Sequence, residues 1–228
     1  ESSGGRYAFA FDFTGWRERD THLDMADVDR IRIYHHCPRC GSTSTEVRTS
    51  QLVVCHTCDL RLYYNPCAAT AAILLDAHDR VLTVRRAKEP AKGMLAFPGG
   101  FVDDGESAEE GVRREVSEET GLKIGALEFL LSRPNTYPYR GIVYRTLDFF
   151  FVARVDDFGE ARPLDGVAEI VTAPIDGLRL EDLAFVSMKA AWSAFLERRR
   201  GRRCCGPVRI MAARWKVGEG RRFFCGGP

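Results

Sequence analysis

Three glutamates near the middle of the chain are spaced so that their carboxylates could act together. Glu115, Glu118 and Glu119 occupy positions i, i+3 and i+4, which lie on one face of a helix. Like charges at this spacing repel one another, and a hard divalent cation such as Mg²⁺ offsets the repulsion because it prefers carboxylate oxygens. The alternatives to a metal site are a solvated charged face and an ion-pair network with Arg113 and Arg114.

Four of the eight cysteines form a second group of chemically active residues. One Cys-x-x-Cys knuckle contains Cys37 and Cys40. A spacer of fourteen residues separates it from a second knuckle, which contains Cys55 and Cys58. Each knuckle places two thiolates on a tight turn, and two facing knuckles supply the tetrahedral ligand set of a structural Zn²⁺. The pattern predicts a zinc ribbon over residues 37–66, with disulfides or redox-active dithiols as the alternative.

The residues around the knuckles are given no chemical role. His35, His36 and His56 adjoin the predicted zinc site, but four cysteines already complete it, so we interpret the histidines as surface residues. Cys67 lies outside both knuckles and is expected to be a buried small hydrophobe. This spacing is unlike the framework of a secreted disulfide-rich domain. A reducing compartment, the cytoplasm, is therefore expected, with an organelle left open.

The elements that would position these groups alternate along the chain. Strand-like runs occupy residues 68–75, 81–84, 127–132, 142–155 and 167–172, and helical patterns occupy residues 106–120 and 187–199. The segment 76–80 reads as a hairpin turn, and the segment 97–100 reads as a loop before the charged helix. This order predicts an α/β domain. No apolar run approaches the roughly 18 residues that cross a bilayer, so no membrane partner is expected.

Charge is distributed unevenly between the two ends of the chain. Residues 198–228 contain ten Lys or Arg and one acidic residue, whereas the whole chain has a formal net charge of +1. The acidic remainder suits an enzyme that concentrates cations. We predict that the basic tail is disordered; contact with RNA through its interleaved aromatic residues is the alternative. Residues 1–36 are interpreted as a partly ordered arm.

The segment from Gly100 to Leu122 resembles the Nudix box. It reads glycine, five residues, glutamate, seven residues, and then Arg-Glu-aliphatic-x-Glu-Glu-x-Gly-aliphatic. So many fixed positions at fixed spacings are far more specific than a single glycine motif. The resemblance implies a Nudix fold over residues 67–197, in which a mixed sheet lies between helices, preceded by the small zinc ribbon. It also implies metal-dependent hydrolysis of a pyrophosphate bond.

The resemblance assigns roles to individual residues of the box. Glu115, Glu118 and Glu119 would bind Mg²⁺ or Mn²⁺ together with a backbone carbonyl at Gly99 or Gly100, and Glu118 and Glu119 would take part in catalysis. The structural residues of the box would be a buried pair of Glu106 with Arg114, and the turn glycines Gly100 and Gly121.

The general base is predicted downstream of the box. Glu169 occupies a position similar to that of a glutamate that approaches the metals in relatives, and a surface glutamate is the alternative interpretation. Glu118 is the second candidate for the base.

A zinc ribbon followed by a Nudix domain is similar to the NADH pyrophosphatase branch of the family. That branch carries a Ser-Gln-Pro-Trp-Pro-Phe-Pro-x-Ser stretch after the box, whereas residues 132–139 here read Ser-Arg-Pro-Asn-Thr-Tyr-Pro-Tyr. Tyr137 and Tyr139 are predicted to stack on a base, and Arg133 or Arg140 to hold a phosphate; shaping a loop is the alternative. A homodimer is expected from the resemblance.

Three functions remain open at this point. The first is hydrolysis of a small nucleoside diphosphate derivative such as NADH or ADP-ribose. The second is removal of NAD-type caps from RNA, with the ribbon and the tail holding the strand. The third is a regulator that senses a nucleotide without catalysis, which an eroded box would favour; the box here is complete.

Overall fold

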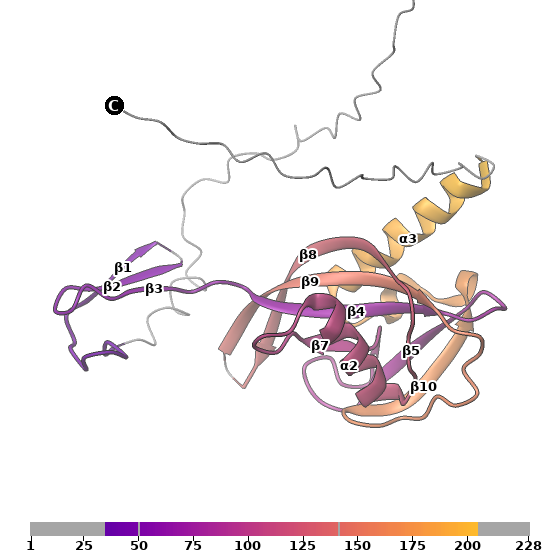
Figure 1. Cartoon of the computed structure of the whole chain (residues 1–228), viewed down its shortest axis with the longest axis horizontal. Coiled ribbons are helices and arrows are strands. Elements are labelled where there is room, and N and C mark those ends of the chain that lie inside the picture. Colours follow the sequence, from indigo (N-terminus) through magenta and orange to yellow (C-terminus); the bar gives the residue numbers. More distant parts are fainter. Residues whose placement is uncertain (1–34, 50, 141, 205–228) are drawn as a thin grey trace, which may run out of the picture.

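The computed structural model describes residues 35–49, 51–140 and 142–204, which form two sheets and two principal helices (Figure 1). Most of the predicted arm at residues 1–36 and most of the predicted tail therefore lie outside the described residues. No helix within the described ranges is long and apolar enough to span a membrane.

The cysteine knuckles flank a small antiparallel sheet in the order β1-β2-β3. Its strands are β1 (Thr45–Thr49), β2 (Leu52–Cys55) and β3 (Arg61–Tyr63). Buried Val53 and Val54 are the apolar residues in its centre. Strands β1 and β2 thus form a short antiparallel hairpin between the two knuckles.

The larger sheet has seven strands, with β10-β5-β4-β9-β8 as its main path, β6 paired to β5 and β7 paired to β4. The strands are β4 (Cys67–Leu75), β5 (Arg80–Arg86), β6 (Leu95–Ala96), β7 (Gly99–Phe101), β8 (Leu127–Tyr139), β9 (Ile142–Arg154) and β10 (Val167–Pro174). Strand β4 runs antiparallel to β5 and parallel to β9. The sheet is mixed, as predicted.

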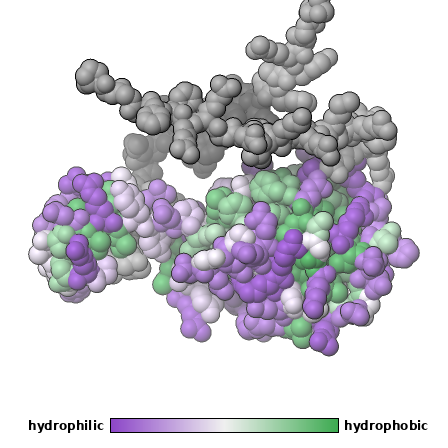
Figure 2. All heavy atoms as spheres, viewed as in Figure 1, coloured by the Kyte–Doolittle hydropathy of each residue, from purple (hydrophilic) through white to green (hydrophobic). Residues whose placement is uncertain are grey.

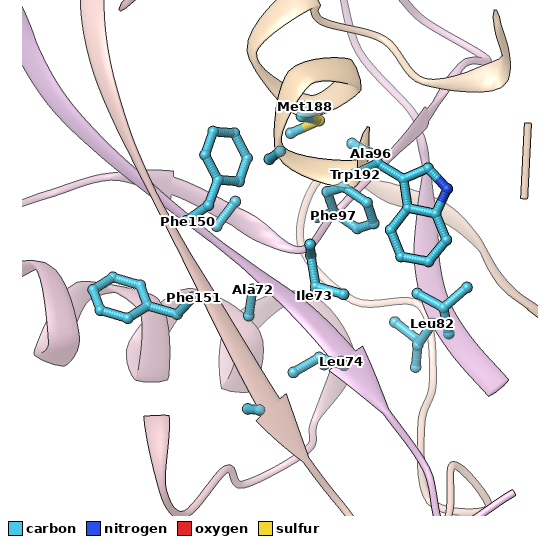
Figure 3. Close-up of a cluster of buried hydrophobic side chains, with 14 of the residues drawn as sticks. Ala72, Ile73, Leu74, Leu82, Ala96, Phe97, Phe150, Phe151, Met188 and Trp192 are labelled. Atoms are coloured by element: carbon cyan, nitrogen blue, oxygen red, sulfur yellow. The ribbon is translucent and has the colours of Figure 1, made fainter. Parts of the chain in front are cut away.

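Helices cover this sheet and bury its central strand. Every residue of β4 from Thr70 to Leu75 is buried, as expected of a strand that is covered on both faces. Helix α2 (Ala108–Thr120) contacts β4 and β7, while α3 (Val186–Cys204) contacts β8. Phe97, in the loop after β6, packs against Trp192 of α3 beside Ile73, and the centroids of the Phe97 and Trp192 rings are 5.8 Å apart (Figure 3).

Helix α2 is fixed at both ends by its own sequence. Ser107 is the N-cap and forms a reciprocal capping box with Glu110. The helix therefore begins at Ala108, and the predicted start at Glu106 was wrong. Gly121 ends the helix in the left-handed conformation with φ of 75°, which glycine adopts at little cost.

The predicted end of strand β8 at Ser132 was wrong. The strand continues to Tyr139 and pairs with β9 along its whole length. Pro134 and Pro138 are tolerated because β8 is an edge strand of the sheet, where a residue without an N–H does not interrupt a ladder. The expected loop at residues 97–100 likewise contains the start of β7.

The C-terminal helix and Cys67 require two further corrections. Helix α3 continues to Cys204, past the predicted start of a disordered tail at Arg198, because Arg198 and Arg199 are anchored by ion pairs to Glu128 and Asp79. Cys67 is exposed, not buried, because it lies at the first position of β4, before the strand enters the core.

Candidate metal centres and ligand pocket

The three glutamates lie on α2, and two of them bind a single arginine. Arg114 Nη1 donates to Glu115 Oε1 at 2.9 Å and to Glu118 Oε2 at 3.1 Å. Figure 2 shows hydrophilic side chains gathered over this helix. The proposed ion-pair network is therefore present, but it involves Arg114 and not Arg113, which donates to backbone carbonyls beyond the helix.

The other side of the Arg114 guanidinium binds the residue that precedes the helix. Its Nε and Nη2 atoms donate to the two carboxylate oxygens of Glu106 at 3.0 and 2.9 Å. This contact holds the pKa of Glu106 below its usual range. The predicted pair is present, although its side chains are partly exposed, at 27% for Arg114 and 15% for Glu106. Arg114 also binds the Phe101 carbonyl and thereby ties β7 to the helix.

Two glycines let β7 pass directly over the carboxylates. A Cβ at Gly99 would lie 2.1 Å from the backbone oxygen of Thr70, and one at Gly100 would lie 2.5 Å from Glu115 Oε1. At Gly99 the contact is with backbone, so only glycine fits, whereas a side chain at Gly100 would displace the Glu115 carboxylate. The Gly99 N–H donates to Glu119 Oε2 at 2.9 Å, so the backbone at Gly99 lies beside Glu119, and the role of its carbonyl as a metal ligand stays a prediction.

Burial makes two of the glutamates costly to ionise. It raises the pKa of Glu119 to about 8, against the lowering effect of the Gly99 hydrogen bond. Burial also raises the pKa of Glu115, more than Arg114 lowers it. A bound divalent cation would favour both carboxylates in their ionised form. The donor set of hard oxygens beside a backbone turn therefore fits Mg²⁺ or Mn²⁺.

The four knuckle cysteines form a compact cluster with all sulfurs within 4.8 Å of one another. The sulfurs of Cys37 and Cys58 are 3.7 Å apart, and those of Cys40 and Cys55 are 3.6 Å apart. A tetrahedral Zn²⁺ with bonds of about 2.3 Å requires sulfur separations of about 3.8 Å, so the cluster fits the ion.

The thiols of this cluster differ in acidity, because the pKa of Cys55 is lowered whereas burial and the neighbouring thiols raise those of Cys40 and Cys58. Burial raises the pKa of the Cys55 thiol, but the N–H groups of Cys58 and Thr57, together with the neighbouring thiols, outweigh it and lower that pKa to about 6. A thiolate is the form that binds zinc. His56 pairs with Glu46 at 3.1 Å and is half-exposed, in agreement with its expected surface position.

A pocket adjoins the glutamates through Gly99 and Gly100. Its lining is mainly apolar and aromatic, with few polar groups, as is usual for small-molecule sites. The lining residues are Ala69, Thr70, Ala71, Arg86, Gly99, Gly100, Phe101, Asn135, Tyr137, Thr146, Asp148, Phe150, Phe185 and Met188.

The structure brings only one of the predicted substrate residues into this pocket. Tyr137 lines it and packs edge-on against Phe101, with ring centroids 5.7 Å apart. Tyr139 is 41% exposed and lies beside Tyr137 with its ring under Arg140. Arg133 is exposed on β8 and is not among the lining residues.

The sequence reasoning missed several residues of the pocket. Arg86 lies with its guanidinium carbon 5.0 Å from the Phe185 ring centroid and donates to the Tyr137 hydroxyl at 3.4 Å. Nothing in the sequence pattern identifies Arg86 or Phe185. Asp148 could have been noticed, because an acidic residue inside the apolar strand β9 is unusual.

The predicted base Glu169 lies on β10 and is 57% exposed. Its Oε2 accepts from Arg85 Nε at 2.7 Å. Arg85 precedes Arg86 on β5, and successive side chains of a strand point to opposite faces. The structure therefore pairs Glu169 with the neighbour of the pocket arginine and not with the pocket itself.

The chain matches the NUDIX domain family over residues 65–196, more than half of its 228 residues, and it therefore belongs to this family. Its structure resembles that of a NUDIX hydrolase from Nitrosomonas europaea, with a TM-score of 0.57 and 23% identity over 73% of this chain and 93% of that chain. This likeness confirms the expected fold.

Two curated relatives are named for the reactions that they catalyse. The chain is 42% identical over 80 residues to the ADP-ribose pyrophosphatase of Methanocaldococcus jannaschii, covering 34% of this chain and 47% of that protein. It is 32% identical over 148 residues to the NAD-capped RNA hydrolase NudC of Chromobacterium violaceum, covering 63% and 52%. The chain thus spans about half the length of these curated relatives.

Proposed function

We propose that this chain hydrolyses the pyrophosphate bond of a nucleoside diphosphate derivative, with ADP-ribose or NADH as the first substrates to test. The observation that carries the proposal is the position of Glu115, Glu118 and Glu119 on one helix face, beside a largely aromatic pocket. The relatives named ADP-ribose pyrophosphatase and NAD-capped RNA hydrolase support this substrate class.

The proposed mechanism divides the work among the described side chains. Glu115, Glu118 and Glu119, with a backbone carbonyl at Gly99, would hold divalent cations. Such cations neutralise charge on the phosphates and lower the pKa of bound water. Arg86 lines the pocket together with Gly99 and Gly100, and its positive charge partly offsets the raised pKa of Glu119, so it could balance charge on a phosphate group.

Glu118 is the better placed of the two proposed general bases, because it shares one face of α2 with Glu115 and Glu119. Both candidates are exposed to water, and each is bound by an arginine, Glu118 by Arg114 and Glu169 by Arg85. Glu169, however, lies on β10, away from the other two carboxylates. Measuring turnover against pH in Glu118→Gln and in Glu169→Gln distinguishes the two, because only loss of the base removes the rising limb of the profile.

The cysteine cluster is proposed to hold a structural Zn²⁺. Four sulfurs close the coordination sphere and leave no position for a substrate. A reducing compartment such as the cytoplasm stays a proposal that rests on the spacing of the cysteines. A homodimer remains a proposal from the resemblance to ribbon-bearing relatives.

A direct assay tests the proposed function. Purified chain is incubated with Mg²⁺ or Mn²⁺ and with ADP-ribose, NADH or NAD-capped RNA, and both products are identified. Cleavage to monophosphates is expected, with loss of turnover in Glu119→Gln and normal turnover in Glu109→Gln, an exposed glutamate on the same helix. Equal rates in Glu119→Gln and wild type would contradict the proposal. A substantial preference for capped RNA would favour the RNA alternative.

A further inference from the structure

The pocket beside the glutamates contains one buried carboxylate that the proposed hydrolysis does not use. We infer that Asp148 selects substrates whose aromatic base carries an amino donor, either the exocyclic amino group of a purine or the carboxamide of a pyridine. This inference rests on the proposed function, because it assumes that a nucleotide places its base in this pocket.

Asp148 is directed into the pocket by the alternation of β9. Thr146, Asp148 and Phe150 are two residues apart on this strand, so their side chains share one face, and all three line the pocket. Asp148 is only 8% exposed. A carboxylate inside an apolar strand is costly unless it has hydrogen-bond partners.

Two hydroxyl groups hold this carboxylate in place. Thr146 Oγ1 donates to Asp148 Oδ1 at 2.5 Å, and Ser187 Oγ at the start of α3 donates to Oδ2 at 2.6 Å. Each oxygen thus has one donor, while a carboxylate oxygen can accept about two. Within the described part of the chain, no cationic side chain forms an ion pair with Asp148. The carboxylate is therefore oriented but can still accept from a ligand.

The walls of the pocket suit a flat ring. The Tyr137 and Phe185 rings lie 5.7 Å apart, and Phe101 and Met188 complete the apolar lining. Stacking on such side chains is favourable for any base and does not distinguish one from another. Discrimination must come from a polar group in the pocket.

The position of the glutamates sets the direction of the bound nucleotide. Gly99 and Gly100 line the pocket on the side where Glu119 and Glu115 lie. Because Asp148 comes from β9, across β4 from the helix, a nucleotide with its phosphates at the glutamates would present its base edge to Asp148. A carboxylate accepts hydrogen bonds and repels a carbonyl oxygen. An amino group at that edge is therefore favoured over a carbonyl or a carboxylate.

Equilibrium binding of monophosphates tests the inference without turnover. The dissociation constant of AMP is compared with that of IMP, which has a carbonyl in place of the amino group. That of nicotinamide mononucleotide is compared with that of nicotinate mononucleotide, which has a carboxylate in place of the carboxamide. A hydrogen bond to a charged group predicts a preference of about 10- to 100-fold for the amino-bearing member of at least one pair.

The variant Asp148→Asn tests whether this residue causes the preference. An amide can donate to a carbonyl as well as accept, so the preference should collapse. The matched control is Asp76→Asn, because Asp76 is also a buried carboxylate of the large sheet, 2% exposed, but caps the turn after β4. This control should keep the wild-type preference even if it lowers stability.

Three outcomes would overturn the inference. The first is a wild-type chain without preference in either pair, and the second is a preference that survives Asp148→Asn. The third is an affinity that falls with 2′- or 3′-deoxyribose analogues of AMP but not with IMP. The wild-type comparison alone decides the matter if Asp148→Asn does not fold. Absence of hydrolysis with intact base preference would reject the proposed function and leave this inference standing.

Discussion

The two predicted ligand sets of this chain differ in what surrounds their ligand atoms. The four cysteine sulfurs face one another within 4.8 Å and form the only group of three or more metal-binding side chains gathered so closely in the described ranges. The glutamates of α2 do not converge in this way. Arg114 donates hydrogen bonds to Glu115 and Glu118, and the Gly99 N–H donates one to Glu119.

We expect this difference to separate a structural ion from a catalytic one. No cationic side chain of the described residues satisfies the thiolates of the cluster, so its folded form should depend on the proposed zinc ion. At the glutamate site, an arginine and a backbone amide already bind the carboxylates that are proposed to hold the metal. Its fold can therefore persist while ions and substrate come and go. Removal of a ligand should thus impair folding at the ribbon and activity at α2.

The largest expected effect is the loss of turnover in Glu119→Gln. Several kcal/mol of transition-state stabilisation by a bound cation correspond to a fall of about 10²- to 10⁴-fold in kcat/KM. The fold should remain, because a neutral amide avoids the cost of burying an ionised carboxylate, which is what raises the pKa of Glu119. Steady-state kinetics and circular dichroism measure the two quantities. If this variant unfolded, the glutamate site would also be needed for folding, and the proposed distinction between a structural and a catalytic site would be wrong.

The glutamate site also shows how far the sequence alone could lead. The i, i+3, i+4 spacing places the carboxylates on one face whatever the surrounding fold, and the stop at Gly121 follows from its backbone freedom. The start of α2 was misplaced by two residues, because the capping role of Ser107 depends on a reciprocal contact with Glu110. Periodicity alone does not reveal that contact.

The second prediction concerns Cys55→Ser, which should remove zinc and unfold the ribbon. Loss of one thiolate opens the closed ligand set, and a structural zinc site supplies much of the folding free energy of so small a module. Zinc content and the lowest-temperature unfolding transition are the measurements. The kcat/KM should change by less than about tenfold, or 1.4 kcal/mol.

The control for this prediction is Cys67→Ser, because Cys67 is an exposed cysteine outside both knuckles. It should retain full zinc content and wild-type melting. A loss of Mg²⁺-dependent turnover in Cys55→Ser with an intact fold would mean that the ribbon takes part in catalysis, and the division between the sites would be wrong.

The ligand pocket was much less predictable than either metal set. Its residues come from β4, β5, β7, β8, β9 and the start of α3, and only the folded sheet brings them together. Tyr137 was found because a local pattern placed it after the box. Asp148 and Phe185 are far from that pattern in sequence, and their roles depend on the register of β9 and on the turn before α3.

The third prediction is a pH dependence of stability in the metal-free protein. The pKa of Glu119 is raised from its ordinary value of 4.5 to about 8, so the folded state binds more protons than the unfolded state between these two pH values. The free energy of unfolding should therefore fall as pH rises through this window, by at most about 1.4 kcal/mol per pH unit for one group.

Denaturant titrations between pH 5 and pH 8.5 measure this slope. It should diminish in Glu119→Gln, and saturating Mg²⁺ should also reduce it by holding the carboxylate ionised in the folded state. Cys55→Ser should not change the slope of the main transition. A slope that is unchanged in Glu119→Gln would show that Glu119 is not the carboxyl group responsible.

The smallest expected effect comes from Arg114→Lys, which replaces the internal cation of the glutamate site. Lysine keeps the charge but not the fork that binds Glu106, Glu115, Glu118 and the Phe101 carbonyl at once. The expected loss is about 1–2 kcal/mol in the free energy of unfolding, with a smaller change in the Mg²⁺ concentration required for half-maximal turnover.

Arg113→Lys is the matched control, because Arg113 lies on the same helix but binds only the carbonyls of Ile124 and Gly125. It should lower stability without changing the Mg²⁺ requirement. If Arg114 stands in for the metal when none is bound, Mg²⁺ should restore more stability to Arg114→Lys than to Arg113→Lys. Equal restoration would mean that the arginine and the cation act on different carboxylates, and that the glutamate site, like the ribbon, has no internal substitute for its ion.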